Sequence, residues 1–147
     1  MIPERLLAQL KIDEGIEEYM YDDITGRRVT TRLPSGGHHT IGVGFNLLTE
    51  PMPEAVMDLW LRILVERVIK ELDKSKPVWR RHNSLRQEVL ANMCYNLGLP
   101  KLLEFRRMWA ALSVGNYEQA ADEMLDSAWA IQVGARARRL AQIMRDG

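Results

Sequence analysis

The chain has 147 residues, of which 46% are apolar and 27% charged, and its formal net charge is zero. This composition is that of a globular protein and excludes a disordered tail. The length suits one domain or two small lobes. No window approaches the roughly 18 apolar residues of a membrane span, and the N-terminus lacks a signal-peptide pattern, so synthesis in a cytoplasm is expected.

The two halves of the chain differ in charge. Up to Asp73 there are 8 basic and 13 acidic residues, and from Lys74 onward there are 12 basic and 7 acidic residues. A basic half is typical of a protein that contacts an anionic polymer, either nucleic acid or bacterial cell wall. Ordinary solvated helix faces would produce the same asymmetry, so both interpretations stay open.

The first predicted element is a helix. Residues 3–13 place leucines at helical spacing, and Gly15 supplies the position that ends a helix. Glu14 is therefore predicted at a helix C-terminus, where the negative end of the helix dipole raises the pKa of a carboxyl group.

Residues 17–47 change to a strand-forming composition. Strand formers at 29–31 and 40–41, separated by glycine- and proline-containing turns, predict an antiparallel hairpin or a three-stranded sheet. Gly42 and Gly44 alternate with larger residues, and two glycines on one strand face would let another chain or a ligand approach closely.

The remainder of the chain is predicted to be helical. A long helix is expected at roughly 53–74, with Pro77 marking its end, and helices follow at about 84–97, 101–113, 117–126 and 128–146, the last broken near Gly134. One helical core is predicted to hold three tryptophans, Trp79, Trp109 and Trp129. The single cysteine, Cys94, forms no internal disulfide and is predicted to be a buried thiol.

Residues 135–145 form a basic amphipathic segment. Leu140, Ile143 and Met144 are predicted to pack on the core. The alternative is a helix that inserts into bacterial membranes.

Several kinds of site are not supported. His38 and His39 are adjacent, so their side chains point apart on a strand, and His82 is distant from both. We therefore predict no metal site and no cofactor. The sequence also lacks a nucleophile elbow, a P-loop and a dinucleotide glycine motif.

Two carboxyl groups and a hydroxyl remain: Glu14, Asp23 and Thr40. Such a set suits cleavage of a glycosidic bond, because one carboxylic acid can protonate the leaving oxygen while a carboxylate supports a water or an ion-like sugar. An ordinary acidic surface over residues 13–23 is the alternative interpretation of the same residues.

The order of these residues resembles that of a known family. Leu10-Lys11-Ile12-Asp13-Glu14-Gly15, then Tyr21-x-Asp23, then Thr40-Ile41-Gly42-Val43-Gly44 is similar to the phage-type lysozymes (endolysins, muramidases) of glycoside hydrolase family 24. The likeness continues in residues 92–98 and in Trp129, Gln132, Arg136 and Arg139. It covers nearly the whole chain.

The resemblance implies a mostly α-helical α+β fold forming a single lysozyme domain over residues 1–147. Its small lobe, about 15–50, holds the hairpin sheet. A connecting helix, about 53–75, joins it to a helical lobe of about 76–147 together with the N-terminal helix.

The resemblance also implies roles for the site residues. Glu14 is the general acid, Asp23 the partner carboxylate, and Thr40 holds the attacking water, as in an inverting mechanism. Arg136 pairs with the catalytic glutamate, and its charge would lower the pKa of that carboxyl group. Tyr95 and Asn46 match positions that contact sugar.

The function implied is hydrolysis of the β-1,4 bond between N-acetylmuramic acid and N-acetylglucosamine in bacterial peptidoglycan, causing host cell lysis. The glycan strands are the expected partner and a monomer the expected state. Passage from the host cytoplasm to the periplasm and wall would need a separate holin-type pore, without direct binding. Alternatives are a lytic transglycosylase on the same substrate, a non-enzymatic helical nucleic-acid-binding protein, and an inactive wall-binding or tail-structural relative.

The chain departs from the family between Asp23 and Thr40, where its hairpin is longer and residues 24–37 carry arginines without acids. This extension either contacts anionic wall components or is a solvent-exposed turn. The spacing from Tyr21 favours Asp23 over Asp22 as the partner carboxylate. The short connection to the long helix predicts that the small lobe loses a helix.

Overall fold

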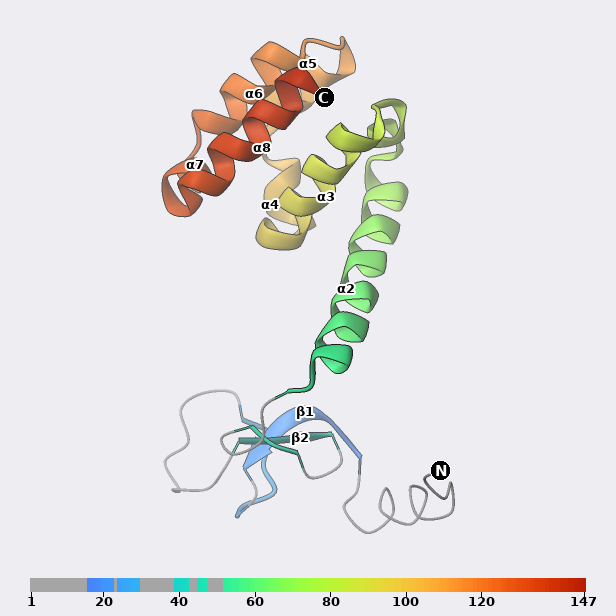
Figure 1. Cartoon of the computed structure of the whole chain (residues 1–147), viewed down its shortest axis with the longest axis vertical. Helices are drawn as coiled ribbons and strands as arrows, with labels where there is room; N and C mark the ends of the chain where they lie inside the picture. Colours follow the sequence, from blue (N-terminus) through green and yellow to red (C-terminus); the bar gives the residue numbers. More distant parts are fainter. Residues whose placement is uncertain (1–15, 23, 30–38, 43–44, 48–51) are drawn as a thin grey trace. The chain divides into compact units, whose positions relative to one another are not determined.

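The computed structural model of the protein describes residues 16–22, 24–29, 39–42, 45–47 and 52–147. The chain divides into two compact units, residues 1–57 and residues 58–147, here named the strand unit and the helical unit. The described elements are mostly helices with one small antiparallel sheet (Figure 1). The predicted fold class, a mostly α-helical α+β fold, is confirmed. The predicted helix at 3–13 lies outside the described residues.

The sheet of the strand unit has three antiparallel strands in the order β1-β2-β3. Their bounds are Glu17–Asp22 for β1, His39–Gly42 for β2 and Phe45–Asn46 for β3. Thr40 on the central strand pairs with Tyr21 on one side and with Asn46 on the other. The register shifts between Glu17 and Tyr21, which marks a bulge in β1.

A strand was predicted at 29–31, and Val29 is the only one of these residues that the structure describes. Val29 lies in no strand, so the prediction is wrong at that position. The chain turns back directly after β1, so that Arg28 forms an isolated bridge with Tyr21 and the amide of Val29 donates to the carbonyl of Met20 at 2.8 Å. The Arg28 guanidinium lies 3.4 Å from the centre of the Tyr19 ring. One arginine of the basic extension thus stacks on an aromatic side chain of the sheet.

A neighbouring side chain lies close against Gly42. Its φ of +70° belongs to the left-handed region, and a Cβ placed there would lie 2.9 Å from the ring of Phe45. Glycine is therefore required where β2 turns toward β3, and the Phe45 ring occupies the position where the close approach of another chain or a ligand was expected. Gly44 lies outside the described residues.

Outside the segment 101–113, the described helices agree closely with their predicted positions. Their bounds are Glu54–Ser75 (α2), Ser84–Leu97 (α3), Leu99–Leu103 (α4), Arg106–Ser113 (α5), Tyr117–Leu125 (α6), Ala128–Val133 (α7) and Ala135–Asp146 (α8), with a 3₁₀ helix η1 at Pro77–Arg81. Asn83, Asn116 and Ser127 each accept a hydrogen bond from a first-turn amide, which fixes the starts of α3, α6 and α7. Gly134, at φ +54°, separates α7 from α8.

The single helix expected over 101–113 is wrong, because it divides into α4 and α5 at Phe105. Phe105 leaves the helical conformation and its ring meets Trp129 edge-to-face, with the centroids 6.3 Å apart. The Trp109 indole donates to the carbonyl of Leu102 at 3.0 Å, satisfying a group at the end of α4. Tertiary packing overrides good local helix propensity here.

The three tryptophans lie in one core, as predicted. Trp79, Trp109 and Trp129 are 2%, 6% and 4% exposed and pack with the apolar faces of α3, α5, α6 and α8. Cys94 is buried in the same core, and burial raises the pKa of its thiol to about 11, so the predicted structural thiol is confirmed.

The apolar side of α8 also faces this core. Leu140 and Met144 are buried and Ile143 packs against them, so the predicted core packing of this basic helix is confirmed. In Figure 1, α8 lies along α6. None of the described helices combines the length and the apolar character needed to cross a membrane.

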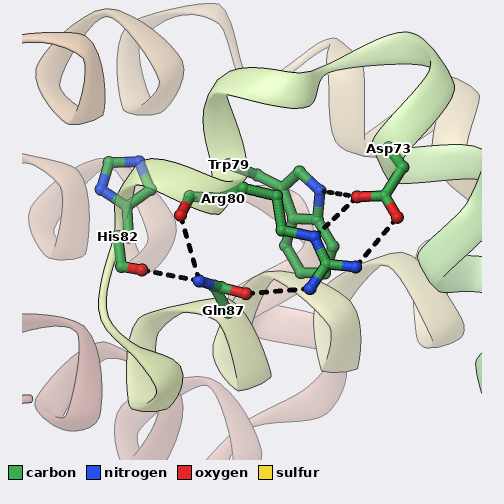
Figure 2. Close-up of polar contacts among 5 residues, drawn as sticks. All are labelled: Asp73, Trp79, Arg80, His82 and Gln87. Carbon is green, nitrogen blue, oxygen red and sulfur yellow. Dashed lines mark hydrogen bonds and ion pairs between the residues drawn. The ribbon is translucent and has the colours of Figure 1, made fainter.

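A polar cluster joins the end of α2 to η1 and α3, and we call Asp73, Trp79, Arg80 and Gln87 the Asp73 clasp (Figure 2). The Asp73 carboxylate accepts from the Trp79 indole at 2.9 Å and from two nitrogens of Arg80 at 2.7 and 2.9 Å. These hydrogen bonds, that of Arg80 first, lower the pKa of Asp73 to about 2. Gln87 accepts from Arg80 at 3.2 Å and donates to the carbonyl of His82 at 2.7 Å.

Candidate functional site

Thr40 and Asn46 lie together on the sheet. They are paired residues of β2 and β3, and Thr40 is only 4% exposed. Asn46 is half-buried at the strand end. Thr40 is therefore a buried residue of the central strand, next to the partly exposed Asn46 of β3.

Asp22, the alternative to Asp23, has a structural role. Its side chain is buried, and its two oxygens accept from the amide of Ile24 at 3.0 Å and from the hydroxyl of Thr25 at 2.8 Å. These contacts form an Asx turn that directs the chain back along β1. Asp23 itself and the predicted general acid, Glu14, lie outside the described residues.

Tyr95 and Arg136 meet in the helical unit. Both line a groove of about 660 Å³ between α2, α3 and the start of α8. Its apolar wall comes from α2, with Leu61, Val65, Val68 and Ile69. Tyr95 is 44% exposed and Arg136 is half-buried, so an aromatic ring and a cation border the same groove. The sequence places these two residues 41 positions apart, and the packing of α8 against α3 brings them together.

Asn92, a residue without a predicted role of its own, anchors Arg136. The guanidinium Nε and Nη2 donate to the Asn92 side-chain oxygen at 3.0 and 2.7 Å. Among the described residues, the acceptors of the Arg136 guanidinium all belong to Asn92. An amide oxygen is a neutral acceptor, so Asn92 orients the guanidinium without forming an ion pair with it. The sequence signal for this role was an asparagine in the middle of a predicted helix. Asparagine is a poor helix former, so its presence there suggests that its side chain makes a specific contact.

Replacing Asn92 tests this anchor. We expect Asn92→Ala to lower the free energy of unfolding by about 1–2 kcal/mol, because the half-buried guanidinium loses its acceptor. Asn92→Asp keeps an acceptor there and should retain most of the stability. Urea unfolding of both variants measures the difference, and equal losses would contradict an anchoring role for the side-chain oxygen.

A second groove, also of about 660 Å³, lies where α4, α5, α6 and α7 meet. Trp129 and Gln132, two residues of the predicted C-terminal segment, border it together with Phe105. The Trp129 indole donates to the side-chain oxygen of Asn96 at 2.7 Å. This bond fixes the wall of the groove to α3, one turn beyond Asn92.

Among the residues that the structure describes, no group of three or more His, Cys, Asp or Glu side chains is arranged to hold a metal ion. The predicted site residues that the structure describes fall into two separate groups, one in each unit. One is Thr40 with Asn46 on the sheet, and the other is Tyr95 with Asn92 and Arg136 in the helical unit.

Comparison with known proteins gives two informative relatives, and no family model matches the chain. The chain is 27% identical over 175 aligned residues to the pre-baseplate central spike protein Gp5 of Enterobacteria phage T4. That alignment covers 98% of this chain and 30% of the spike protein. The chain is also 21% identical over 168 aligned residues to "Probable T4-type lysozyme 1" of Dictyostelium discoideum. That alignment covers 94% of this chain and 92% of the Dictyostelium protein.

Proposed function

We propose that this chain is a lysozyme-type glycosidase that cleaves bacterial peptidoglycan. The observation that carries the proposal is the likeness to the T4-type lysozyme, which extends over nearly the full length of both proteins. The mostly helical α+β fold and the buried Thr40 on the central strand are in keeping with it. The bond proposed is the β-1,4 link between N-acetylmuramic acid and N-acetylglucosamine.

The proposed mechanism divides the work among three side chains. Glu14 gives a proton to the glycosidic oxygen as the bond to the sugar carbon breaks. Thr40 holds a water on the opposite face, and the oxygen of this water forms the new bond to the sugar carbon. Asp23 stabilises the positive charge that develops on the sugar and takes up the proton that this water releases. Separation of the carboxyl groups by roughly 6.5–9.5 Å, with water between them, would invert the configuration at that carbon.

Tyr95, Asn46 and Arg136 have supporting roles in this proposal. Tyr95 offers an exposed ring for a sugar face and Asn46 offers an amide for its hydroxyl groups. Arg136, oriented by Asn92, supplies the fixed positive charge that the catalytic glutamate is proposed to pair with. The site of action would be the cell wall of a bacterial host.

Digestion of purified peptidoglycan tests the proposal. We expect soluble fragments with ordinary reducing ends, detected by mass spectrometry. Anhydro ends would instead identify a lytic transglycosylase. No cleavage, together with salt-dependent DNA binding, would favour the nucleic-acid-binding alternative. No cleavage and no DNA binding would favour the structural role suggested by the likeness to a spike protein, of which this chain spans only 30%.

A further inference from the structure

His82 is a buried histidine at a junction of helices, outside the candidate site. It follows η1 directly and is 7% exposed. Its ring meets the Tyr117 ring of α6 edge-to-face, with centroids 5.8 Å apart and an interplanar angle of 82°. Its carbonyl accepts from Gln87 of the Asp73 clasp, and the ring extends away from that contact (Figure 2). The side chain therefore belongs to the packing between η1 and α6.

The ring nitrogens of His82 are poorly matched to a positive charge. Nδ1 lies 3.5 Å from the Tyr117 hydroxyl, at the limit of a hydrogen bond, and Nε2 is buried without a partner among the described residues. A neutral imidazole carries one N–H, for which the Tyr117 hydroxyl is an acceptor at Nδ1, whereas the charged ring carries an N–H at both nitrogens and needs a second acceptor at Nε2. Protonation would thus leave a buried N–H without an acceptor, which is costly in a protein interior.

The charged group facing His82 from α3 is another cation. The Arg86 guanidinium lies 3.6 Å from the centre of the Tyr117 ring. It is fixed there because it donates to the carbonyls of Met144 at 2.9 Å and of Arg145 at 3.0 Å, at the end of α8. Burial, and then the charge of Arg86, lower the pKa of His82.

No carboxylate among the described residues forms an ion pair with His82. The nearby acids of α6, Glu118 and Asp122, pair with the Arg145 side chain at 2.9 and 2.5 Å. On the side of η1, Arg80 is held by Asp73 at 2.7 Å, and Arg81 is exposed. A proton arriving at the His82 ring would therefore add a second positive charge near Arg86, with no counter-ion supplied by the described residues.

We propose that His82 is an acid-sensitive joint of the helical unit, which holds η1 against α6 while its ring is neutral and releases this contact when the ring takes up a proton. A group whose pKa is lower in the folded than in the unfolded chain binds more protons after unfolding. The stability that neutral His82 contributes is therefore complete above about pH 6.5, the ordinary pKa of histidine, and is lost as the pH falls below it.

The experiment follows thermal unfolding of the full chain from about pH 8 to about pH 5. In the wild type we expect Tm to fall by several degrees on acidification. His82→Phe keeps an aromatic ring for Tyr117 but cannot titrate, so its Tm should fall clearly less. The matched control replaces the other two histidines, His38→Gln with His39→Gln, and should retain the wild-type fall.

An equal fall in His82→Phe and the wild type would overturn the proposal. If that variant does not fold, the His82 ring is titrated in the wild type by NMR. A midpoint below that of a free histidine, with faster amide exchange in α6 and η1 as the ring charges, supports the joint. An ordinary midpoint with unchanged exchange refutes it. Neither measurement depends on wall cleavage, so the proposed function and this joint can fail separately.

Discussion

Glu14→Gln is expected to reduce peptidoglycan cleavage by roughly 10²–10⁴-fold, the usual contribution of a general acid. Glutamine has nearly the shape of glutamate but no proton of suitable acidity for the departing glycosidic oxygen. Because the two side chains have nearly the same volume, circular dichroism and Tm are expected to remain close to those of the wild type. Turbidity loss of permeabilised cells, or release of soluble fragments, gives the rate.

A nearby acid provides the matched control for Glu14. Asp13→Asn removes the same charge one position earlier and should leave most of the activity. Comparable losses in both variants would point to a general need for negative charge over residues 13–23, as in the acidic-surface interpretation. Full activity in Glu14→Gln would refute the proposed general acid.

Asp23→Asn is expected to be severe as well, with a loss of about 10²-fold or more, because a neutral amide cannot stabilise positive charge on the sugar. Asp22→Asn should retain activity within a few fold. In the wild type the Asp22 carboxylate accepts from the Ile24 amide and from the Thr25 hydroxyl, which lies 2.8 Å away. In the variant, the side-chain oxygen of asparagine can still accept from Ile24. Its NH₂ group can donate to the Thr25 hydroxyl, which accepts as well as donates.

Initial rates of the two variants on the same wall preparation decide between the two neighbouring acids. If Asp22→Asn is the more damaging while its Tm is unchanged, the alignment of this hairpin with the lysozyme family is displaced by one residue. If Asp22→Asn is damaging only because Tm has fallen, the Asx turn is the cause.

The helices are predictable from the sequence where local chemistry determines them. Asn83, Asn116 and Ser127 are short polar residues that cap helices, and Gly134 supplies the left-handed backbone between α7 and α8. These signals act within one helical turn. The break at Phe105 lacks such a signal, because it depends on Trp129, which arrives from a distant part of the chain.

The sequence proposes candidate site residues but does not predict the contacts that the described ones make. The grouping of Tyr95 with Arg136, and the anchoring of Arg136 by Asn92, depend on α8 packing against α3. Neither hydrophobic periodicity nor spacing specifies which polar side chains will meet across two helices. Asp22 shows the same limit, since its identity as a turn residue follows from hydrogen bonds to Ile24 and Thr25.

The turn at Gly42 has a consequence for judging catalytic competence in related sequences. Its left-handed backbone and the Phe45 ring against it mean that this glycine is required by the shape of the hairpin. A descendant that had lost catalysis but kept its hairpin would keep this glycine as well. Gly42 therefore reports inheritance of the hairpin, whereas under the proposed mechanism the joint retention of Glu14, Asp23 and Thr40 would be the more discriminating mark of an active enzyme.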